Sequence, residues 1–170
     1  EKGTDRGRFF RGEVDKYTWQ EVGSSFLPGE LIAAFLWAQL EEAQAITDRR
    51  MESWEYYHAA LASFEDKGML RRPIIPEGCQ HNAHMYYVLL TLGIDRQYVL
   101  NELKRNEINA VFHYVPLHSS PAGQRYGRVH GELDMTNRQS ERLIRLPLWV
   151  GLTQGQQDRV LDVLGNTICS

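Results

Sequence analysis

The stretch MYYVLLTLGIDRQYVLNELKRNEINAVFHYVPLH, residues 85–118, decides the fold class. Its beginning, residues 85–91, is rich in aromatic and β-branched side chains, which favours a strand. Asp95 is a good helix N-cap, and the apolar residues that follow it recur at helical spacing as far as Ile108. Residues 110–115 again have the composition of a strand. The order strand, helix, strand predicts an α+β domain with helices packed on one face of a sheet.

The remaining C-terminal sequence predicts two more helices. Thr136 is expected to cap a short helix that contains Ser140, Leu143 and Ile144. Thr153 is expected to begin the last helix. The apolar residues of that helix, which we expect to face inward, are Val160, Leu161, Val163 and Leu164.

A long helical region precedes the strand–helix–strand stretch. Pro28 suits the first position of a helix, and Glu30 suits its positive N-terminal end. One apolar face is predicted from Ile32, Phe35, Leu36, Gln39, Leu40, Ala43 and Ile46. A second apolar run either continues this helix or follows a kink; it consists of Met51, Trp54, Tyr57, His58, Leu61 and Phe64.

The boundaries of this helical region are set by breakers. Lys67 and Gly68 are a plausible stop, and Pro73 and Pro76 after it indicate an extended connector. Residues 1–27 show no sustained period and are expected to be irregular. An irregular strip of this length is unusual inside a compact domain, so the chain is interpreted as a fragment of a larger protein.

Composition excludes some classes of partner. The 170 residues carry a net charge of -3, with 42% hydrophobic and 24% charged residues, as in ordinary globular proteins. This balance gives no reason to expect nucleic acid or an anionic membrane as a partner. The most apolar stretch, residues 31–40, is half the length of a membrane span. Two distant cysteines, Cys79 and Cys169, suggest reduced thiols in a cytoplasmic protein.

Two groups of residues have the chemistry of a site. Cys79, His81 and His84 have a spacing that resembles a metal site, but no second pair supplies further ligands, so a loop thiol with one core histidine is favoured and no metal is expected. The segment from His113 to His118 lies where a strand ends, with His113 and Val115 on one strand face, Tyr114 on the other, and Pro116 ending the ladder. That segment is either a packed or solvated histidine pair or a binding site.

Phosphate and nucleophile motifs are scarce. Ser24 and Ser25 precede the long helix, where hydroxyls and free N–H groups can either hold a phosphate or simply cap the helix. The sequence contains neither a P-loop, nor a G-x-G-x-x-G stretch, nor a G-x-S-x-G elbow. The lysines all lie in polar stretches, which do not activate a Schiff-base lysine; they are Lys2, Lys16, Lys67 and Lys104.

Several of these stretches resemble the DegT/StrS-type sugar-nucleotide aminotransferases. ELIAA at 30–34 with AQL at 38–40 is similar to that family's helix, which reads roughly N-Y-R-M-x-E-x-x-A-A-x-x-x-x-Q-L. HYVPLHSSP at 113–121 is similar to its H-Y-x-P-L-H-x-x-P signature. The closing segment resembles the pattern S-E-R, L-P-L, L-T and Q, which stands here at 140–142, 146–148, 152–153 and Gln157. RFFRGEVDKYTW at 8–19 and GSSFLP at 23–28 resemble one branch, which acts on dTDP-linked sugars.

The resemblance implies a fold and a domain organisation. It implies the C-terminal small domain of a type I pyridoxal-phosphate aminotransferase, with a long linking helix and a small, mostly antiparallel sheet. Residues 1–27 would be the last strip of the large cofactor domain, 28–68 the linking helices and 69–170 the small domain. The family's Schiff-base lysine would lie upstream of Glu1, so this chain alone is expected to be inactive.

The resemblance also implies ligands and site residues. The intact enzyme would be a cytoplasmic homodimer that binds pyridoxal 5'-phosphate, L-glutamate and a dTDP-keto sugar. Ser25 stands where many members have an asparagine that reaches the cofactor phosphate across the dimer, so Ser25 is the expected cofactor-binding residue. Substrate-binding roles are expected for His113, Tyr114 and His118. Two alternatives stay open: a pyridoxal-phosphate sugar dehydratase of the same family, and a non-catalytic module that shares the small-domain fold.

Overall fold

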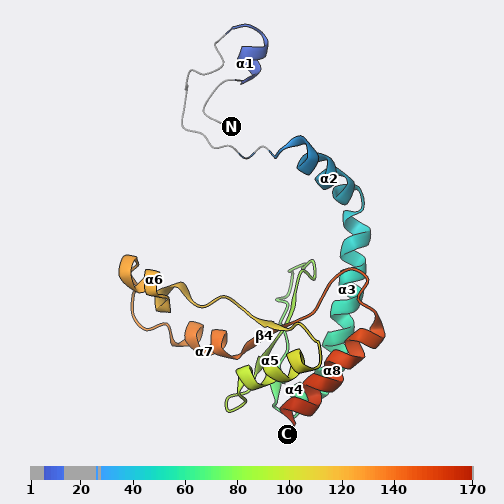
Figure 1. Ribbon diagram of the computed structural model, residues 1–170, viewed down its shortest axis with the longest axis vertical. Coiled ribbons are helices and arrows are strands. Elements are labelled where there is room, and N and C mark those ends of the chain that lie inside the picture. The colour runs from blue at the N-terminus through green and yellow to red at the C-terminus, as the bar shows by residue number, and fades with distance from the viewer. Residues whose placement is uncertain (1–5, 14–25, 27, 170) are drawn as a thin grey trace. The chain divides into compact units, whose positions relative to one another are not determined.

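The structure is a computed structural model that describes residues 6–13, 26 and 28–169. The chain divides into two compact units, residues 1–43 and 44–170, which are described separately below (Figure 1). Among the described residues, none of the helices combines the length and the apolar character that crossing a membrane requires.

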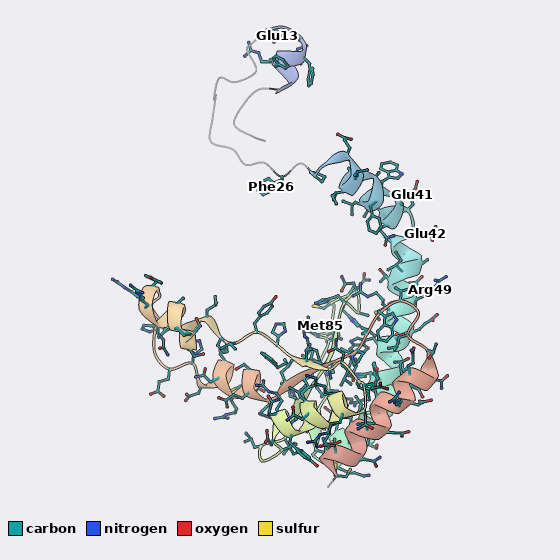
Figure 2. All side chains as sticks on the ribbon, in the orientation of Figure 1. Glu13, Phe26, Glu41, Glu42, Arg49 and Met85 are labelled. Carbon is teal, nitrogen blue, oxygen red and sulfur yellow. The ribbon has the colours of Figure 1, made fainter. Side chains whose placement is uncertain are left out.

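The first unit contains the helices α1 (Arg6–Phe10) and α2 (Glu30–Glu41). The expectation that residues 1–27 are irregular is therefore wrong for 6–10. Just after this helix, the Glu13 carboxylate forms ion pairs with Arg8 and with Arg11. Helix α2 begins at Glu30 with Gly29 as its N-cap, so Pro28 lies outside the helix rather than at its first position. Figure 2 shows Glu41 and Glu42 where α2 ends.

Helix α2 is apolar but unburied. Within the described chain it has no buried residue, and Leu31, Phe35 and Trp37 are 86%, 69% and 68% exposed. Ile32 and Leu36 on the predicted apolar face are also exposed, at 64% and 48%. Monomeric proteins rarely leave such a large apolar surface in water.

The second unit is built on a four-stranded antiparallel sheet in the order β1-β2-β4-β3. Its strands are β1 (Leu70–Arg71), β2 (Tyr86–Leu90), β3 (Val111–Phe112) and β4 (Leu143–Leu146). The central pair places Tyr86 opposite Leu146 and Val88 opposite Ile144. The expected antiparallel sheet and the strand at 85–91 are confirmed, whereas the two-residue edge strand β1 was not predicted.

The helix predicted to begin at Thr136 needs a correction. Helix α7 runs from Asp134 to Arg142, with Leu133 as an N-cap that provides no side-chain hydrogen bond. Leu143 and Ile144, which were assigned to the helix, belong to strand β4. Burial alternates along β4 as in a strand, with Ile144 and Leu146 buried. Pairing with the central strand β2 overrides the local helical pattern of these residues.

The helices of this unit are α3 (Ala43–Ala60), α4 (Ala62–Asp66), α5 (Arg96–Arg105), the 3₁₀ turn η1 (Leu117–Ser119), α6 (Pro121–Tyr126), α7 and α8 (Gln154–Ile168). Two of the predicted caps are confirmed. The carboxylate of Asp95 accepts a hydrogen bond from the backbone N–H of Gln97 at 2.8 Å. Thr153 and Gln156 form a capping box at the start of α8. The predicted stop after α4 is also confirmed, since Lys67 is its C-cap and Gly68 has a φ of 70°.

The hydrophobic core lies where α3, α5 and α8 meet one face of the sheet. Helices α5 and α8 lie side by side (Figure 1). Alternate residues of the paired strands point into the core, which contains Tyr57, Leu61, Tyr86, Val88, Leu90, Val99, Leu103, Ile144, Val160 and Leu164. Of the residues expected to face inward on α8, Leu161 and Val163 are only partly buried.

Gln157, part of the family-like closing segment, is a buried polar link between α8 and α3. Its side chain is 3% exposed, and its Nε2 donates a hydrogen bond to the Ser53 carbonyl at 2.8 Å. The amide thus satisfies a backbone acceptor inside the domain, which accounts for a polar residue in the core.

Candidate functional site

The segment His113–His118 leaves the sheet earlier than the sequence predicts. Strand β3 contains only Val111 and Phe112, so the alternation expected for residues 113–115 as strand residues is wrong. Phe112 pairs with Ile144 of β4. Strand β4 begins only one residue before Ile144, and the chain that precedes β4 is the helix α7. The edge strand β3 therefore reaches the end of its partner strand soon after Phe112. Pro116 also lacks the N–H that a ladder hydrogen bond requires.

Freed from the sheet, the segment presents side chains to the surface. Tyr114 is 83% exposed and Val115 is 59% exposed, while His113 is half-buried. The rings of His113 and Tyr114 meet edge-on with centroids 5.4 Å apart. An exposed aromatic ring supported by an imidazole is a surface on which a ring of a ligand can stack.

Helix α7 holds the far end of the segment. The Nε2 of His118 lies 2.8 Å from the Oδ1 of Asn137, and the Ser140 hydroxyl donates to the Asn137 carbonyl one turn later. Figure 1 shows α7 leading directly into β4, the strand next to β3. The loop, the helix and the sheet edge therefore form one connected unit.

Two hollows adjoin residues 113–116. The larger, of about 570 Å³, is also lined by Met135, Thr136 and Gln139 of α7. The smaller, of about 370 Å³, is also lined by Asn137 and Glu141, and by Arg96. Residues spaced by four lie on one side of a helix, so each hollow uses a different side of α7. The larger hollow is predominantly apolar, and the smaller one is richer in hydrogen-bonding and charged groups.

Unsatisfied polar atoms also lie around the larger hollow. The Nδ1 of His113 and the Oε1 of Gln139 are shielded from solvent and have no hydrogen-bond partner in the described structure. Leaving such atoms unpaired is costly, so a group that completes their hydrogen bonds would be bound favourably.

The structure brings three of the four predicted site residues into one place. His113, Tyr114 and His118 lie on the same segment beside α7, and the hydrogen bond to Asn137 fixes the His118 ring. Ser25, like Ser24, lies outside the described residues. Sequence reasoning missed Arg96, Asn137 and Gln139, because nothing in a polar helix or at a helix start marks one side chain as facing a hollow.

The Cys79, His81 and His84 group does not come together as a site. The ring of His81 packs on Trp54 with centroids 4.5 Å apart, while Cys79 and His84 are exposed. Within residues 6–13, 26 and 28–169, no three histidine, cysteine or acidic side chains are arranged to hold a metal ion.

Of the four lysines, the structure describes Lys67, the C-cap of α4, and Lys104 on α5. Both are exposed, and neither lines the hollows beside His113.

Comparison with known proteins decides the family. Residues 4–165 match the model of the DegT/DnrJ/EryC1/StrS aminotransferase family. The chain belongs to this family. Aminotransferases of the DegT/DnrJ/EryC1/StrS type depend on pyridoxal phosphate and act in the synthesis of amino sugars, which agrees with the resemblance found in the sequence.

The curated relatives extend beyond this chain. An uncharacterized protein of Methanocaldococcus jannaschii is 29% identical over 148 residues, which are 85% of this chain and 37% of the relative. The dTDP-3-amino-3,4,6-trideoxy-alpha-D-glucose transaminase of Micromonospora megalomicea subsp. nigra is 25% identical over 165 residues, 96% of this chain and 43% of the relative. The chain thus spans about two fifths of the length of these relatives.

Solved structures share the fold. DesV of S. venezuelae superposes with a TM-score of 0.79 at 24% identity, over 92% of this chain and 41% of that one. The sugar aminotransferase CalS13 of Micromonospora echinospora has a TM-score of 0.78 at 17% identity, over 96% and 42%. The PLP-form of the putative sugar aminotransferase Spr1654 of Streptococcus pneumoniae has a TM-score of 0.68 at 22% identity, over 82% and 35%.

Proposed function

We propose that this chain is the C-terminal portion of an aminotransferase that moves the amino group of L-glutamate to C4 of a dTDP-4-keto-6-deoxyhexose. The observation that carries the proposal is the family match across residues 4–165. The stretches at 8–19 and 23–28 support a finer assignment, to the dTDP-4-amino-4,6-dideoxygalactose transaminase of enterobacterial common antigen synthesis, a step in making a polysaccharide precursor. The protein would act in the cytoplasm.

The contribution of this chain would be substrate binding. Tyr114 offers an exposed ring for stacking, and the half-buried His113 beside it offers a hydrogen bond to the sugar or to the nucleotide. His118 is oriented by Asn137, so its ring is held in place before any ligand arrives. The hollows on either side of these residues are large enough to contain part of a nucleotide sugar.

The cofactor would be held largely by parts of the protein other than the described residues. Pyridoxal phosphate supplies the electron sink for amine transfer when it is bound. In this proposal residues 1–27 belong to the large cofactor domain, 28–68 to linking helices and 69–170 to the small domain. Ser25 would donate a hydrogen bond to the cofactor phosphate across a homodimer interface. This chain alone would bind no cofactor and catalyse nothing.

The exposed helix α2 supports the homodimer part of the proposal. Six large apolar side chains of α2 are between 48% and 86% exposed: Leu31, Ile32, Phe35, Leu36, Trp37 and Leu40. We propose that the large domain or the second subunit covers them in the intact enzyme. Burying side chains of this size would contribute roughly 1.5–3 kcal/mol each.

The test is a reaction of the proposed full-length protein with pyridoxal phosphate, L-glutamate and dTDP-4-keto-6-deoxyglucose, with the product identified by NMR. A 4-amino sugar with an axial amine would support both the transaminase and the galacto assignment. An equatorial amine would keep the transaminase and reject the galacto assignment. A dehydrated sugar would replace the proposal by the dehydratase, and an untouched substrate without cofactor binding would favour a non-catalytic module.

A further inference from the structure

Arg96, the first residue of α5, is a half-buried cation held in a defined position. One of its guanidinium nitrogens, Nη1, donates a hydrogen bond to the Ser140 carbonyl at the end of α7. Its guanidinium also lies over the Phe112 ring, 5.4 Å from the ring centroid. These two contacts fix the side chain between a helix and the edge of the sheet.

The charge of Arg96 is not neutralised within the described structure. No carboxylate of the described residues forms an ion pair with it. A partly desolvated guanidinium normally meets an acidic group, because its planar fork of N–H donors matches a carboxylate or a phosphate. Among the hydrogen bonds of the described residues, Arg96 donates through Nη1 alone.

Arg96 also lines the smaller hollow beside the predicted substrate residues. The same hollow is lined by His113, Tyr114 and Asn137, and by the hydroxyl-bearing Ser119. An unpaired cation, an imidazole and an amide around one cavity provide donors for an oxyanion, while the Ser119 hydroxyl donates to the Pro116 carbonyl. The aromatic ring of Tyr114 adds a surface for an attached ring.

We propose that Arg96 binds an oxyanion of the ligand, a phosphate or a carboxylate, in this smaller hollow. The proposal rests on the proposed function for the sources of that oxyanion, which are the diphosphate of the nucleotide sugar and the carboxylates of the amino donor. It places the charged end of the ligand beside Arg96 and leaves the predominantly apolar larger hollow for an uncharged part.

Glu141 is the one carboxylate among the residues that line this hollow, and its charge opposes an anion. It lies on α7, is exposed and lines the same cavity without pairing with Arg96. A carboxylate at this rim would weaken oxyanion binding through repulsion, in part screened by solvent. Removing its charge with Glu141→Gln is therefore expected to strengthen binding severalfold, and a purely structural Arg96 would not produce that gain.

The experiment is a titration of the 170-residue chain with inorganic pyrophosphate and, separately, with L-glutamate, followed by amide NMR shifts and calorimetry. Binding should perturb the signals of Arg96, His113 and Asn137. Arg96→Gln should weaken it about tenfold or more, the loss expected for a charge-assisted hydrogen-bond pair. Arg71→Gln, which removes an exposed arginine on β1 outside the hollow, is the matched control and should leave the affinity unchanged.

The outcomes separate the sources and the alternatives. Tighter binding of pyrophosphate assigns the site to the diphosphate, and tighter binding of glutamate assigns it to the amino donor. Arg96→Lys keeps the charge but loses the fork, so it should bind with intermediate affinity even where Arg96→Gln folds poorly. Equal affinity of the wild type and a folded Arg96→Gln, or no binding to the wild type, would overturn the proposal. Transaminase activity of the full-length protein is scored independently of this titration.

Discussion

The imidazole of His118 and the side-chain amide of Asn137 are joined by a hydrogen bond of 2.8 Å. This contact spans nineteen positions of sequence and ties the loop after β3 to α7. It makes the arrangement of His113, Tyr114 and His118 depend on a helix that contributes no predicted site residue.

Asn137→Ala should therefore loosen the loop. Loss of one partly buried hydrogen bond is expected to lower the free energy of unfolding by about 1 kcal/mol. Urea unfolding of the 170-residue chain measures it. The matched control is Asn101→Ala, which removes an exposed bond between Asn101 and Gln97 and should cost less. Equal costs for the two variants would contradict this expectation, because the His118–Asn137 contact would then stabilise the fold no more than the exposed bond does.

Gly123 should tolerate no side chain. A Cβ at this position of α6 would lie 1.6 Å from the Leu117 carbonyl oxygen, so the 3₁₀ turn η1 or α6 would have to move. We expect Gly123→Ala to destabilise the chain by about 1–3 kcal/mol. It should also shift the NMR signals of His118, which lies within η1.

Gly155→Ala on α8 is the control for that substitution. Its Cβ would meet nothing within 4 Å, and alanine favours a helix, so the change should be neutral or stabilising by up to about 1 kcal/mol. A Gly123→Ala variant as stable as Gly155→Ala would contradict the predicted collision.

The stability of the chain should fall as the pH falls through the range where histidine titrates. Burial, and next the nearby charge of Arg72, lower the pKa of His58 from its ordinary value near 6.5. The His58 ring is stacked on Trp54 at 4.6 Å, and its Nδ1 lies 3.4 Å from the Tyr86 hydroxyl. Since the unfolded chain binds the proton more readily, stability is highest above the unfolded pKa and decreases below it.

His58→Gln should flatten that dependence. The measurement compares melting temperatures at pH 8 and at pH 5.5 for the wild type and the variant. The variant is expected to lose less stability between these two pH values, whatever its stability at pH 8. An equal loss in the two proteins would assign the pH dependence to other groups.

Self-association should depend on the apolar surface of α2. Phe35 is 69% exposed, and Phe35→Glu places a charge among its apolar neighbours, so it should reduce concentration-dependent association measured by sedimentation. Leu92→Glu is the matched control, because Leu92 is 68% exposed but lies in the turn after β2. A wild-type chain that stays monomeric at high concentration would contradict this expectation.

The sequence predicts the elements that carry strong local signals. The caps Asp95 and Thr153 and the apolar strand at 85–91 mark α5, α8 and β2, and the structure confirms each. It does not predict β4, because Leu143 and Ile144 continue a helical pattern and become part of a strand only through pairing with β2. The short edge strand β1 likewise depends on the neighbouring strand rather than on its own residues.

The candidate site is predictable only in part for a similar reason. His113, Tyr114 and His118 are visible because they follow a strand-like stretch and match a family signature. Arg96 and Asn137 become part of the site only when α5 and α7 are packed against the end of β3. Their roles arise from contacts between distant positions, 44 apart for Arg96 with Ser140 and 19 apart for His118 with Asn137, which local patterns do not encode.

The most direct test of the account is the reaction of the proposed full-length protein with L-glutamate and dTDP-4-keto-6-deoxyglucose. Tyr114→Ala is the accompanying variant, because the exposed ring is proposed to contact the substrate. The account predicts a 4-amino sugar by NMR for the wild type and a higher KM for the nucleotide sugar in the variant. Failure of the pyridoxal-phosphate-loaded wild type to transfer an amine to any nucleotide-linked keto sugar would contradict it.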